Sequence, residues 1–338
     1  MPEADTIAAA RHGDEAAFEQ LVAAHRSGLH AHCYRMLGSV HDADDALQET
    51  LLAAWRGLGG FEGRSSLRSW LYRIATHVCL RLAAIRRRRA VPDLLPACAD
   101  VTDLGDMMTE PIWLEPYPPA DPEARYAELE NVELAFVAAL QQLPARQRAV
   151  LILREVLQFP ASEVARILDQ SVASVNSSLQ RARKTMAARQ VPSQQAELAA
   201  LGDRGRRELV GAFVRAWEQA DVQAMVALLA QDARFSMPPL PAWFDGRAAV
   251  MAFMAERMWD TPWRLVPIVA NGQIAFACYQ QQAYDEPFCL GALNVVSLRH
   301  GRVAELTGFL DPAIYRRFGL EAMSPALAVS PYQQTGRN

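Results

Sequence analysis

Residues 160–184, PASEVARILDQSVASVNSSLQRARK, contain two helical patterns that are separated by a short break. Pro160 stands where a helix would begin, because its fixed backbone angle and missing N–H suit the first helical turn. Asp169 lies in the break and tolerates left-handed backbone geometry better than most residues. The apolar residues of the second pattern recur at helical spacing and are expected on a buried face: Val172, Val175, Leu179 and Met186. A short helix, a tight turn and a second helix predict a helix-turn-helix.

The other face of the second helix carries small polar side chains followed by the basic tail RARK at 181–184. Small side chains let a backbone approach another molecule closely. Asn and Gln can pair with base edges, and Arg and Lys with phosphates. The pattern therefore suits a DNA-reading helix, although an ordinary amphipathic surface helix has the same periodicity.

The charge of the chain is unevenly distributed. A formal net charge of −4 over 338 residues gives no general attraction to nucleic acid. Between residues 141 and 190, however, eight Arg and Lys residues stand against three Asp and Glu residues. A second basic run, RRRR at 86–89, ends another helical pattern. Two separate basic patches suit a modular nucleic-acid binder. Solubility is the alternative explanation, and a single patch would be weak evidence.

Composition excludes several other classes of protein. The five cysteines form no C-x-x-C pair, which argues against a disulfide framework and a structural zinc site. His25, His30, His32 and Cys33 could in principle hold a metal, but His30 and His32 point to different sides of a helix, so we expect neither metal nor cofactor. GLGGFEG at 57–63 lacks the last glycine of a dinucleotide-binding loop. No membrane-length apolar run and no signal-peptide start occur, so a cytoplasmic protein without a membrane partner is expected.

The chain divides into segments of different character. We expect a helical domain at residues 7–90, followed by a Pro-rich linker at 91–122 that contains IWLEPYPP. A second helical domain with the helix-turn-helix is expected at 123–190, and a polar linker at 191–204. An α+β domain at 205–320 and a disordered tail at 321–338 come last. Linkers of purely solvent character seldom carry Trp and Tyr together. We therefore expect the linker residues Trp113, Leu114, Pro116 and Tyr117 to dock on a neighbouring domain.

The last domain combines helices with a sheet. Two helical patterns follow Gly205, and apolar or alternating stretches come after them. The dipeptides Asn271-Gly272 and His300-Gly301 stand between such stretches and are hairpin signals. Helices followed by an antiparallel sheet predict an α+β domain.

Three segments resemble a bacterial extracytoplasmic-function (ECF) sigma factor of the sigma-70 class, in the right order and spacing. They are DADDALQETLLAAW at 42–55, FEGRSSLRSWLYRIATHVCL at 61–80, and residues 143–184. Residues 205–320 resemble the SnoaL-like branch of the NTF2-like fold, and WLEPYP and FDGRAAV are typical of sigma factors with such an extension. The resemblance implies a multi-domain fold: two all-α sigma domains, a helical bundle and a helix-turn-helix, and a C-terminal α+β cone-shaped domain.

The resemblance also implies binding of the core RNA polymerase, through its β′ clamp helices and β flap. The residues it assigns to core binding are Asp44, Asp45, Gln48 and Glu49, beside an apolar seam of Leu47, Leu51 and Trp55. Acidic side chains beside an apolar seam suit a basic coiled-coil partner. A solvated acidic face is the alternative.

Promoter DNA, double-stranded and melted, is the other implied partner. For the −10 element and melting, the matching residues are Phe61, Arg64, Ser65, Ser66, Arg68, Arg73 and His77; family members often carry Asn in place of His77, and Trp70 is expected in the core. For the −35 element, the residues expected at base or sugar-phosphate distance are Ser171, Ser174, Asn176, Ser177 and Gln180. Phosphate contacts are expected from Arg181, Arg183 and Lys184, with Arg146 and Arg148 helping from the preceding helix.

The implied function is that of a sigma factor that directs promoter recognition, DNA melting and transcription initiation. The C-terminal domain would regulate it in cis and could hold a small-molecule ligand. Catalysis there is not expected: Tyr279, Asp245 and Asp311, with Trp217, Trp243 and Phe253 as a pocket wall, show no spacing that forces a catalytic site. The alternatives are a ligand-responsive helix-turn-helix regulator that is not a sigma factor, and a cyclase-like enzyme with a DNA-binding appendage.

Overall fold

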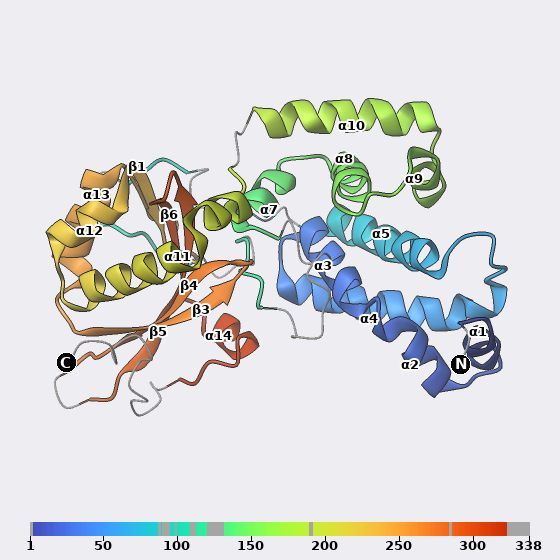
Figure 1. Cartoon of the computed structure of the whole chain (residues 1–338), viewed down its shortest axis with the longest axis horizontal. Coiled ribbons are helices and arrows are strands. Elements are labelled where there is room, and N and C mark those ends of the chain that lie inside the picture. The colour runs from blue at the N-terminus through green and yellow to red at the C-terminus, as the bar shows by residue number, and fades with distance from the viewer. Residues whose placement is uncertain are drawn as a thin grey trace. The chain divides into compact units, whose positions relative to one another are not determined.

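In the computed structural model the chain forms two compact units (Figure 1). The first combines residues 1–90 with 120–191, and the second combines residues 91–119 with 192–338. The structure describes residues 3–86, 89, 95–98, 100–108, 113–119, 132–188, 192–283 and 286–322, so most of the predicted disordered tail lies outside the described residues. Within these ranges, no helix combines the length and the apolar character needed to cross a membrane.

Capped helices form the first part of the first unit. They are α1 (Glu3–Arg11), α2 (Glu15–Ala23), α3 (Arg26–Leu37), α4 (Val40–Gly57) and α5 (Leu67–Ile85). Asp14, Ser39 and Ser66 cap α2, α4 and α5, because each side chain accepts a hydrogen bond from the N–H group three residues later. Gly38 ends α3 in the left-handed conformation, with φ 72°.

The second part of the first unit contains the predicted helix-turn-helix. Its elements are α7 (Leu134–Gln141), α8 (Ala145–Leu151), the π-helical turn Ile152–Val156, α9 (Ala161–Ile167) and α10 (Val172–Ala187). Asp169 lies in the turn between α9 and α10 with φ 52°. Ser171 caps α10 by accepting a hydrogen bond of 3.1 Å from the N–H of Ser174. The helix-turn-helix prediction is confirmed.

The two helical parts of this unit pack against each other. Gln141, the last residue of α7, donates from Nε2 to the carbonyl of Arg35 on α3 at 3.1 Å. The ring of Tyr72 on α5 meets the ring of Phe159 edge to face, with 5.5 Å between the centroids. Residues more than 80 positions apart in the sequence therefore share one core.

The second unit is built around one mixed sheet. Its strands are β1 (Leu229–Ser236), β2 (Trp243–Asp245), β3 (Trp263–Ala270), β4 (Gln273–Gln280), β5 (Cys289–Arg299) and β6 (Arg302–Phe309). They lie in the order β2-β1-β6-β5-β4-β3, with β1 and β6 parallel and the other neighbours antiparallel.

Two tight hairpin turns fix the register of the sheet. Asn271 and Gly272 have φ of 55° and 66°, and His300 and Gly301 have φ of 53° and 71°. Positive φ at both central residues is the geometry of the two-residue turn that matches strand twist. Both hairpins therefore form at the dipeptides that signalled them.

Helices complete the second unit: α11 (Gln194–Glu218), α12 (Val222–Leu228), α13 (Arg247–Phe253) and α14 (Pro312–Arg317), with a π-helical turn at Met254–Met258. The start of α11 falls in residues 191–204, which the sequence presented as a linker. Gln194 explains the difference, because its buried amide donates to the carbonyl of Leu298 at 3.0 Å and accepts from the Leu298 N–H at 2.6 Å. Gly202 then kinks the helix, with φ 63°.

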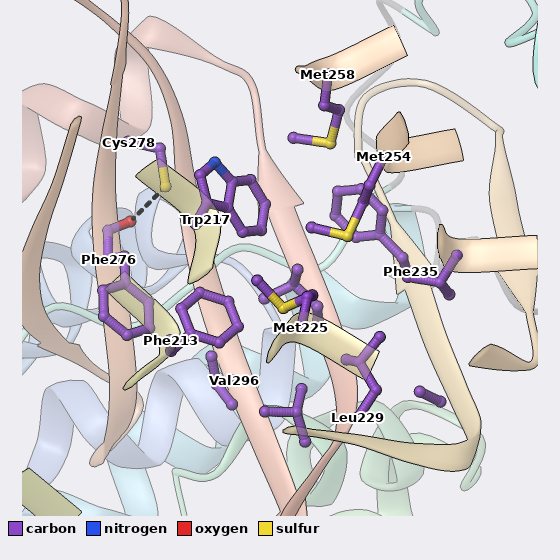
Figure 2. Close-up of a cluster of buried hydrophobic side chains, with 14 of the residues drawn as sticks. Phe213, Trp217, Met225, Leu229, Phe235, Met254, Met258, Phe276, Cys278 and Val296 are labelled. Carbon is purple, nitrogen blue, oxygen red and sulfur yellow. Dashed lines mark hydrogen bonds between the residues drawn. The ribbon is translucent and has the colours of Figure 1, made fainter. Parts of the chain in front are cut away.

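Aromatic and methionine side chains fill the core between the sheet and its helices. Phe213 on α11 stacks on Phe276 of β4, with 4.7 Å between ring centroids and an interplanar angle of 13°. In Figure 2 the side chains of Met225, Met254 and Met258 gather on one side of the fully buried Trp217. Methionine adapts to irregular gaps, which suits this packing.

The described part of the Pro-rich segment packs on the second unit. Trp243 donates from its indole to the carbonyl of Leu95 at 2.8 Å, and Trp113 donates to the carbonyl of Pro239 at 3.1 Å. Tyr117 exchanges two hydrogen bonds with Asn271: its N–H donates to Oδ1 and its carbonyl accepts from the Asn271 N–H, both at 2.8 Å. Side chains of Trp113, Leu114, Pro116 and Tyr117 are buried. The segment is thus part of this unit and not a free tether.

Candidate nucleic-acid interface

The polar face of α10 is open to solvent. Val175, Leu179 and Ala182 lie on the buried side of the helix. All eight residues of α10 and its cap that were predicted to meet the −35 element are exposed: Ser171, Ser174, Asn176, Ser177, Gln180, Arg181, Arg183 and Lys184. Arg183 forms an ion pair of 2.6 Å with Glu155. Burial of one side and exposure of small polar and basic groups on the other is the arrangement that a major-groove helix needs.

Val172 departs from the sequence expectation. The periodicity predicts it on the buried stripe with Val175 and Leu179, but 42% of Val172 is exposed. It is the first residue of α10, so it stands at the end of the buried stripe and has no preceding turn of the helix beside it. Periodicity gives the direction of a side chain but not the length of the surface that covers it.

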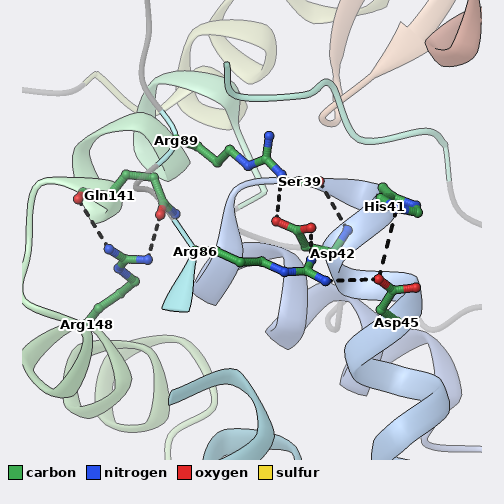
Figure 3. Close-up of polar contacts among 8 residues, drawn as sticks. All are labelled: Ser39, His41, Asp42, Asp45, Arg86, Arg89, Gln141 and Arg148. Atoms are coloured by element: carbon green, nitrogen blue, oxygen red, sulfur yellow. Dashed lines mark hydrogen bonds and ion pairs between the residues drawn. The ribbon is translucent and has the colours of Figure 1, made fainter. Parts of the chain in front are cut away.

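Arg148 is a correction to the predicted set of phosphate contacts. Only 3% of the residue is exposed. Its guanidinium donates to Oε1 and the carbonyl of Gln141 (Figure 3). It also donates to the carbonyl of Leu143 at 3.1 Å and to the carbonyl of Met36. Arg148 therefore satisfies carbonyls at helix ends inside the unit. Arg146 is exposed, as a phosphate contact requires.

The loop before α5 holds the first half of the predicted melting residues. Arg64 is exposed and pairs with Glu62 at 2.8 Å, and Ser66 is the exposed cap of α5. Ser65 is half-buried. Phe61 is buried and packs on the half-buried ring of Trp70, with 5.1 Å between centroids, so in this structure it forms part of the core rather than an exposed wedge.

Three predicted −10 residues on α5 contact the helix-turn-helix or the residues directly before it. Arg73 pairs with Asp169 at 2.9 Å. His77 lies 2.8 Å from the carbonyl of Ile167 through Nε2 and 3.5 Å from Asp169. Arg68 donates to the carbonyl of Leu157 at 3.2 Å, and its guanidinium lies 4.3 Å from the ring centroid of Phe159. In this arrangement the three side chains hold protein rather than DNA.

The basic run at 86–89 also has a structural role. Arg86 and Arg89 both pair with the buried carboxylate of Asp42, and Arg86 reaches Asp45 at 3.1 Å (Figure 3). Asp42 lies in the first turn of α4, where a carboxylate also interacts favourably with the helix dipole. At least these two arginines therefore neutralise α4 instead of forming a free nucleic-acid patch.

A groove of about 530 Å³ runs between α2 and α4. Its apolar lining consists of Phe18, Leu47, Leu51, Leu52 and Trp55. Its polar lining consists of Glu15, Glu19, Arg26, Asp44 and Gln48, with Arg26 paired to Glu19 at 2.8 Å. Of the four predicted core-binding residues, Asp44 and Gln48 thus line the groove. Asp45 and Glu49 instead pair with Arg86 and Arg81.

Sequence reasoning missed the contribution of α2 to this groove. Phe18 meets Trp55 edge to face, with 5.0 Å between the ring centroids. The apolar pattern in AAFEQLVAA at 16–24 marked α2 as amphipathic, but nothing in it indicated that Phe18 would pair with α4.

The candidate catalytic residues of the second unit have separate structural partners. Asp245 is exposed and pairs with Arg234 at 3.3 Å, and Asp311 caps α14. Burial raises the pKa of Tyr279, on β4. Trp217 and Phe253, the expected pocket wall, are packed core residues, and Trp243 holds the segment around Leu95.

The side chains of the His-rich stretch contact different partners, and His30 lies 3.0 Å from Asp44. Among the described residues, no cluster of three or more His, Cys, Asp and Glu side chains is placed to hold a metal. His32 is fully buried, with Nε2 3.0 Å from Thr76 Oγ1. Burial, reinforced by the charge of Arg35, lowers the pKa of His32 to about 3, so the imidazole is neutral.

Comparison with known proteins agrees with this architecture. Residues 21–91 match the Sigma-70 region 2 family, residues 133–186 the Sigma-70, region 4 family, and residues 210–306 the SnoaL-like domain family. The ECF RNA polymerase sigma factor SigG of Mycobacterium tuberculosis is 41% identical over 307 residues, which span 88% of this chain and 82% of SigG. The chain belongs to the ECF family of RNA polymerase sigma factors. The family predicted from the sequence is confirmed.

Other relatives of this sigma factor cover less of it or share the fold alone. ECF sigma factor SigM of Mycobacterium tuberculosis is 34% identical over 55% of the chain and 83% of SigM. The crystal structure of the ECF sigma factor SigJ of the same organism matches 90% of this chain and 99% of SigJ, with a TM-score of 0.62 and 19% identity. That likeness confirms the fold of two helical sigma domains and a C-terminal α+β domain. A sigma factor is not an enzyme, and the alternative of a ligand-responsive regulator that is not a sigma factor is not favoured.

Proposed function

We propose that this sigma factor acts in the cytoplasm, where it binds core RNA polymerase and brings it to promoters through α10 and α5. The exposed face of α10 enters the major groove of the −35 element, while the loop before α5 and α5 itself hold the −10 element. The observation that carries the proposal is the exposure of all eight predicted −35 residues of α10 and its cap, on a helix whose other side is buried in a helix-turn-helix.

The groove between α2 and α4 is the proposed site for core polymerase. Its apolar lining includes Leu51 and Leu52. Glu15 and Asp44 add carboxylates to it, while Glu19 pairs at 2.8 Å with Arg26, which also lines the groove. Such a groove suits an amphipathic helical partner with basic residues beside an apolar stripe, which is the expected character of the β′ clamp helices.

Run-off transcription with purified core polymerase tests both assignments. Promoters selected from a random library by the wild-type protein would be the templates. Leu52→Glu, in the groove, is expected to abolish transcripts and core binding together. Asn176→Ala, on α10, is expected to keep core binding and to lose transcription from selected promoters. Val266→Glu, at a similarly exposed apolar position on β3, is the control and should keep both activities. Core binding by Leu52→Glu at the wild-type level would contradict the groove assignment.

We further propose that the C-terminal domain regulates the sigma domains in cis through the segment that contains Trp113 and Tyr117, and that it carries no catalysis. The double hydrogen bond between Tyr117 and Asn271 supports this, because it ties that segment to the β3–β4 turn. A ligand would act here only by binding one arrangement of the segment better than another.

Asn271→Gly tests this regulation. Glycine keeps the positive φ of the turn but removes the Oδ1 acceptor. Run-off transcription should change by severalfold relative to wild type, whereas His300→Gly in the other hairpin should leave it unchanged. Equal transcription by wild type and Asn271→Gly would contradict regulation through this contact. Turnover of any substrate by the full chain would overturn the non-catalytic assignment.

A further inference from the structure

The first turn of α10 presents an apolar side chain to solvent. Val172 is 42% exposed at the first position of the helix. Its neighbours Ser171, Ala173 and Ser174 are also exposed, and the Ser171 hydroxyl is engaged as the helix cap. A single exposed valine is common on protein surfaces and carries no meaning by itself. The position of Val172 gives it meaning, because the N-terminal residues of a recognition helix are the ones that reach base edges.

The chemistry of the major groove indicates which group of a base an exposed valine can contact there. Among the four bases, only thymine presents a methyl group in the major groove. The two γ-methyl groups of valine are rigidly placed, because β-branching leaves few side-chain rotamers. Asn176 follows one helical turn later and is exposed, so the same flank of α10 offers both an apolar contact and an amide that can pair with adenine.

We propose that Val172 is a specificity-determining residue that reads the C5-methyl group of a thymine in the upstream promoter element. The inference rests on the proposed function of α10 as the recognition helix. It adds a residue outside the predicted set, which contained only polar and charged side chains. Contact with one methyl group amounts to about 0.8 kcal/mol, which corresponds to an approximately fourfold change in binding.

Replacement of thymine by deoxyuridine is the direct test, since it removes the methyl group and changes nothing else in the base pair. Full-length sigma factor with core polymerase would be bound to a selected promoter in which each upstream thymine is replaced in turn. At one position, the wild-type holoenzyme is expected to lose roughly three- to fivefold in affinity. Val172→Ala is expected to bind the thymine and uracil templates equally at that position and to keep any other sensitivity.

Val222→Ala is the matched control. Val222 is also 42% exposed and is also the first residue of a helix, α12, but it lies in the second unit. This variant is expected to keep the complete wild-type pattern. Alanine at an exposed first helical position is tolerated, so loss of fold does not confound either variant.

The outcomes separate the inference from the function on which it rests. If no upstream thymine is sensitive, or if Val172→Ala keeps the wild-type uracil effect at every position, the inference is wrong while α10 remains the recognition helix. A uniform loss by Val172→Ala on all templates would assign Val172 to a contact with protein or backbone and would also overturn it. Failure of the wild-type holoenzyme to select any promoter would overturn the proposed function itself.

Discussion

The guanidinium of Arg73 on α5 lies 2.9 Å from the carboxylate of Asp169, in the turn between α9 and α10. The same carboxylate lies 3.5 Å from His77. Asp169 thus holds two side chains that the −10 element is proposed to use. Under that proposal DNA and the helix-turn-helix compete for these side chains, and we expect the −10 element to gain them only when the turn moves away from α5.

Asp169→Asn should therefore favour promoter binding. Asparagine tolerates the positive φ of this position but lacks the negative charge. Both partners are about half exposed, so the ion pair contributes only about 0.5–1 kcal/mol. We expect holoenzyme affinity for a promoter to rise roughly two- to fivefold, measured by fluorescence anisotropy. The control Asp203→Asn removes an exposed ion pair with Arg206 in the second unit and should change nothing. A lower affinity for Asp169→Asn would mean that the contact assists binding.

Salt dependence separates phosphate contacts from base contacts on α10. Arg181→Ala and Lys184→Ala should each reduce the slope of log affinity against log salt by about 0.9, because each releases one fewer counterion. Asn176→Ala should weaken binding and leave the slope unchanged. Arg204→Ala, an exposed arginine in the second unit, is the control. An unchanged slope for both basic variants would mean that Arg181 and Lys184 do not contact the DNA phosphates.

Arg148 offers a test of burial against charge. Arg148→Met keeps most of the side-chain volume but leaves the carbonyls of Gln141, Leu143 and Met36 without their donor. Loss of these bonds should lower the free energy of unfolding by about 2–4 kcal/mol, measured by urea denaturation. Arg146→Ala, at an exposed position on the same helix, should stay within about 0.5 kcal/mol of wild type. A larger loss of unfolding free energy for Arg146→Ala than for Arg148→Met would mean that Arg148 lies at the surface in solution.

Local chemistry made part of this structure predictable. Asn271-Gly272 and His300-Gly301 predicted the two hairpins, because few other dipeptides tolerate positive φ at both positions. Asp169 predicted the turn of the helix-turn-helix, because aspartate tolerates positive φ better than most residues. In each case a few neighbouring residues decide the backbone, so the sequence contains the whole cause.

Tertiary contacts decided the features that the sequence did not reveal. Arg148 looks like any arginine on a basic helix, and only the packing of α8 against α7 and α3 buries it beside carbonyls that it can satisfy. Val172 matches the spacing of the buried residues, but it is exposed because it stands at the very start of α10. Gln194 belongs to a polar stretch, and only the backbone of Leu298 makes it part of a folded helix. Periodicity and composition contain no information about such partners.

Acid should destabilise the first unit through His32. Burial lowers the folded-state pKa of His32 to about 3, whereas in the unfolded chain it is about 6.5. Between these values the unfolded state binds more protons, so the stabilisation is complete above pH 6.5 and is lost as pH falls toward 3. At pH 5 the loss amounts to about 2 kcal/mol. His32→Gln should flatten the dependence of unfolding free energy on pH between 7 and 5, measured by urea titrations at each pH. The control His12→Gln, on the exposed surface, should keep the wild-type slope. Equal slopes for wild type and His32→Gln would mean that His32 is protonated, or open to water, in the folded protein.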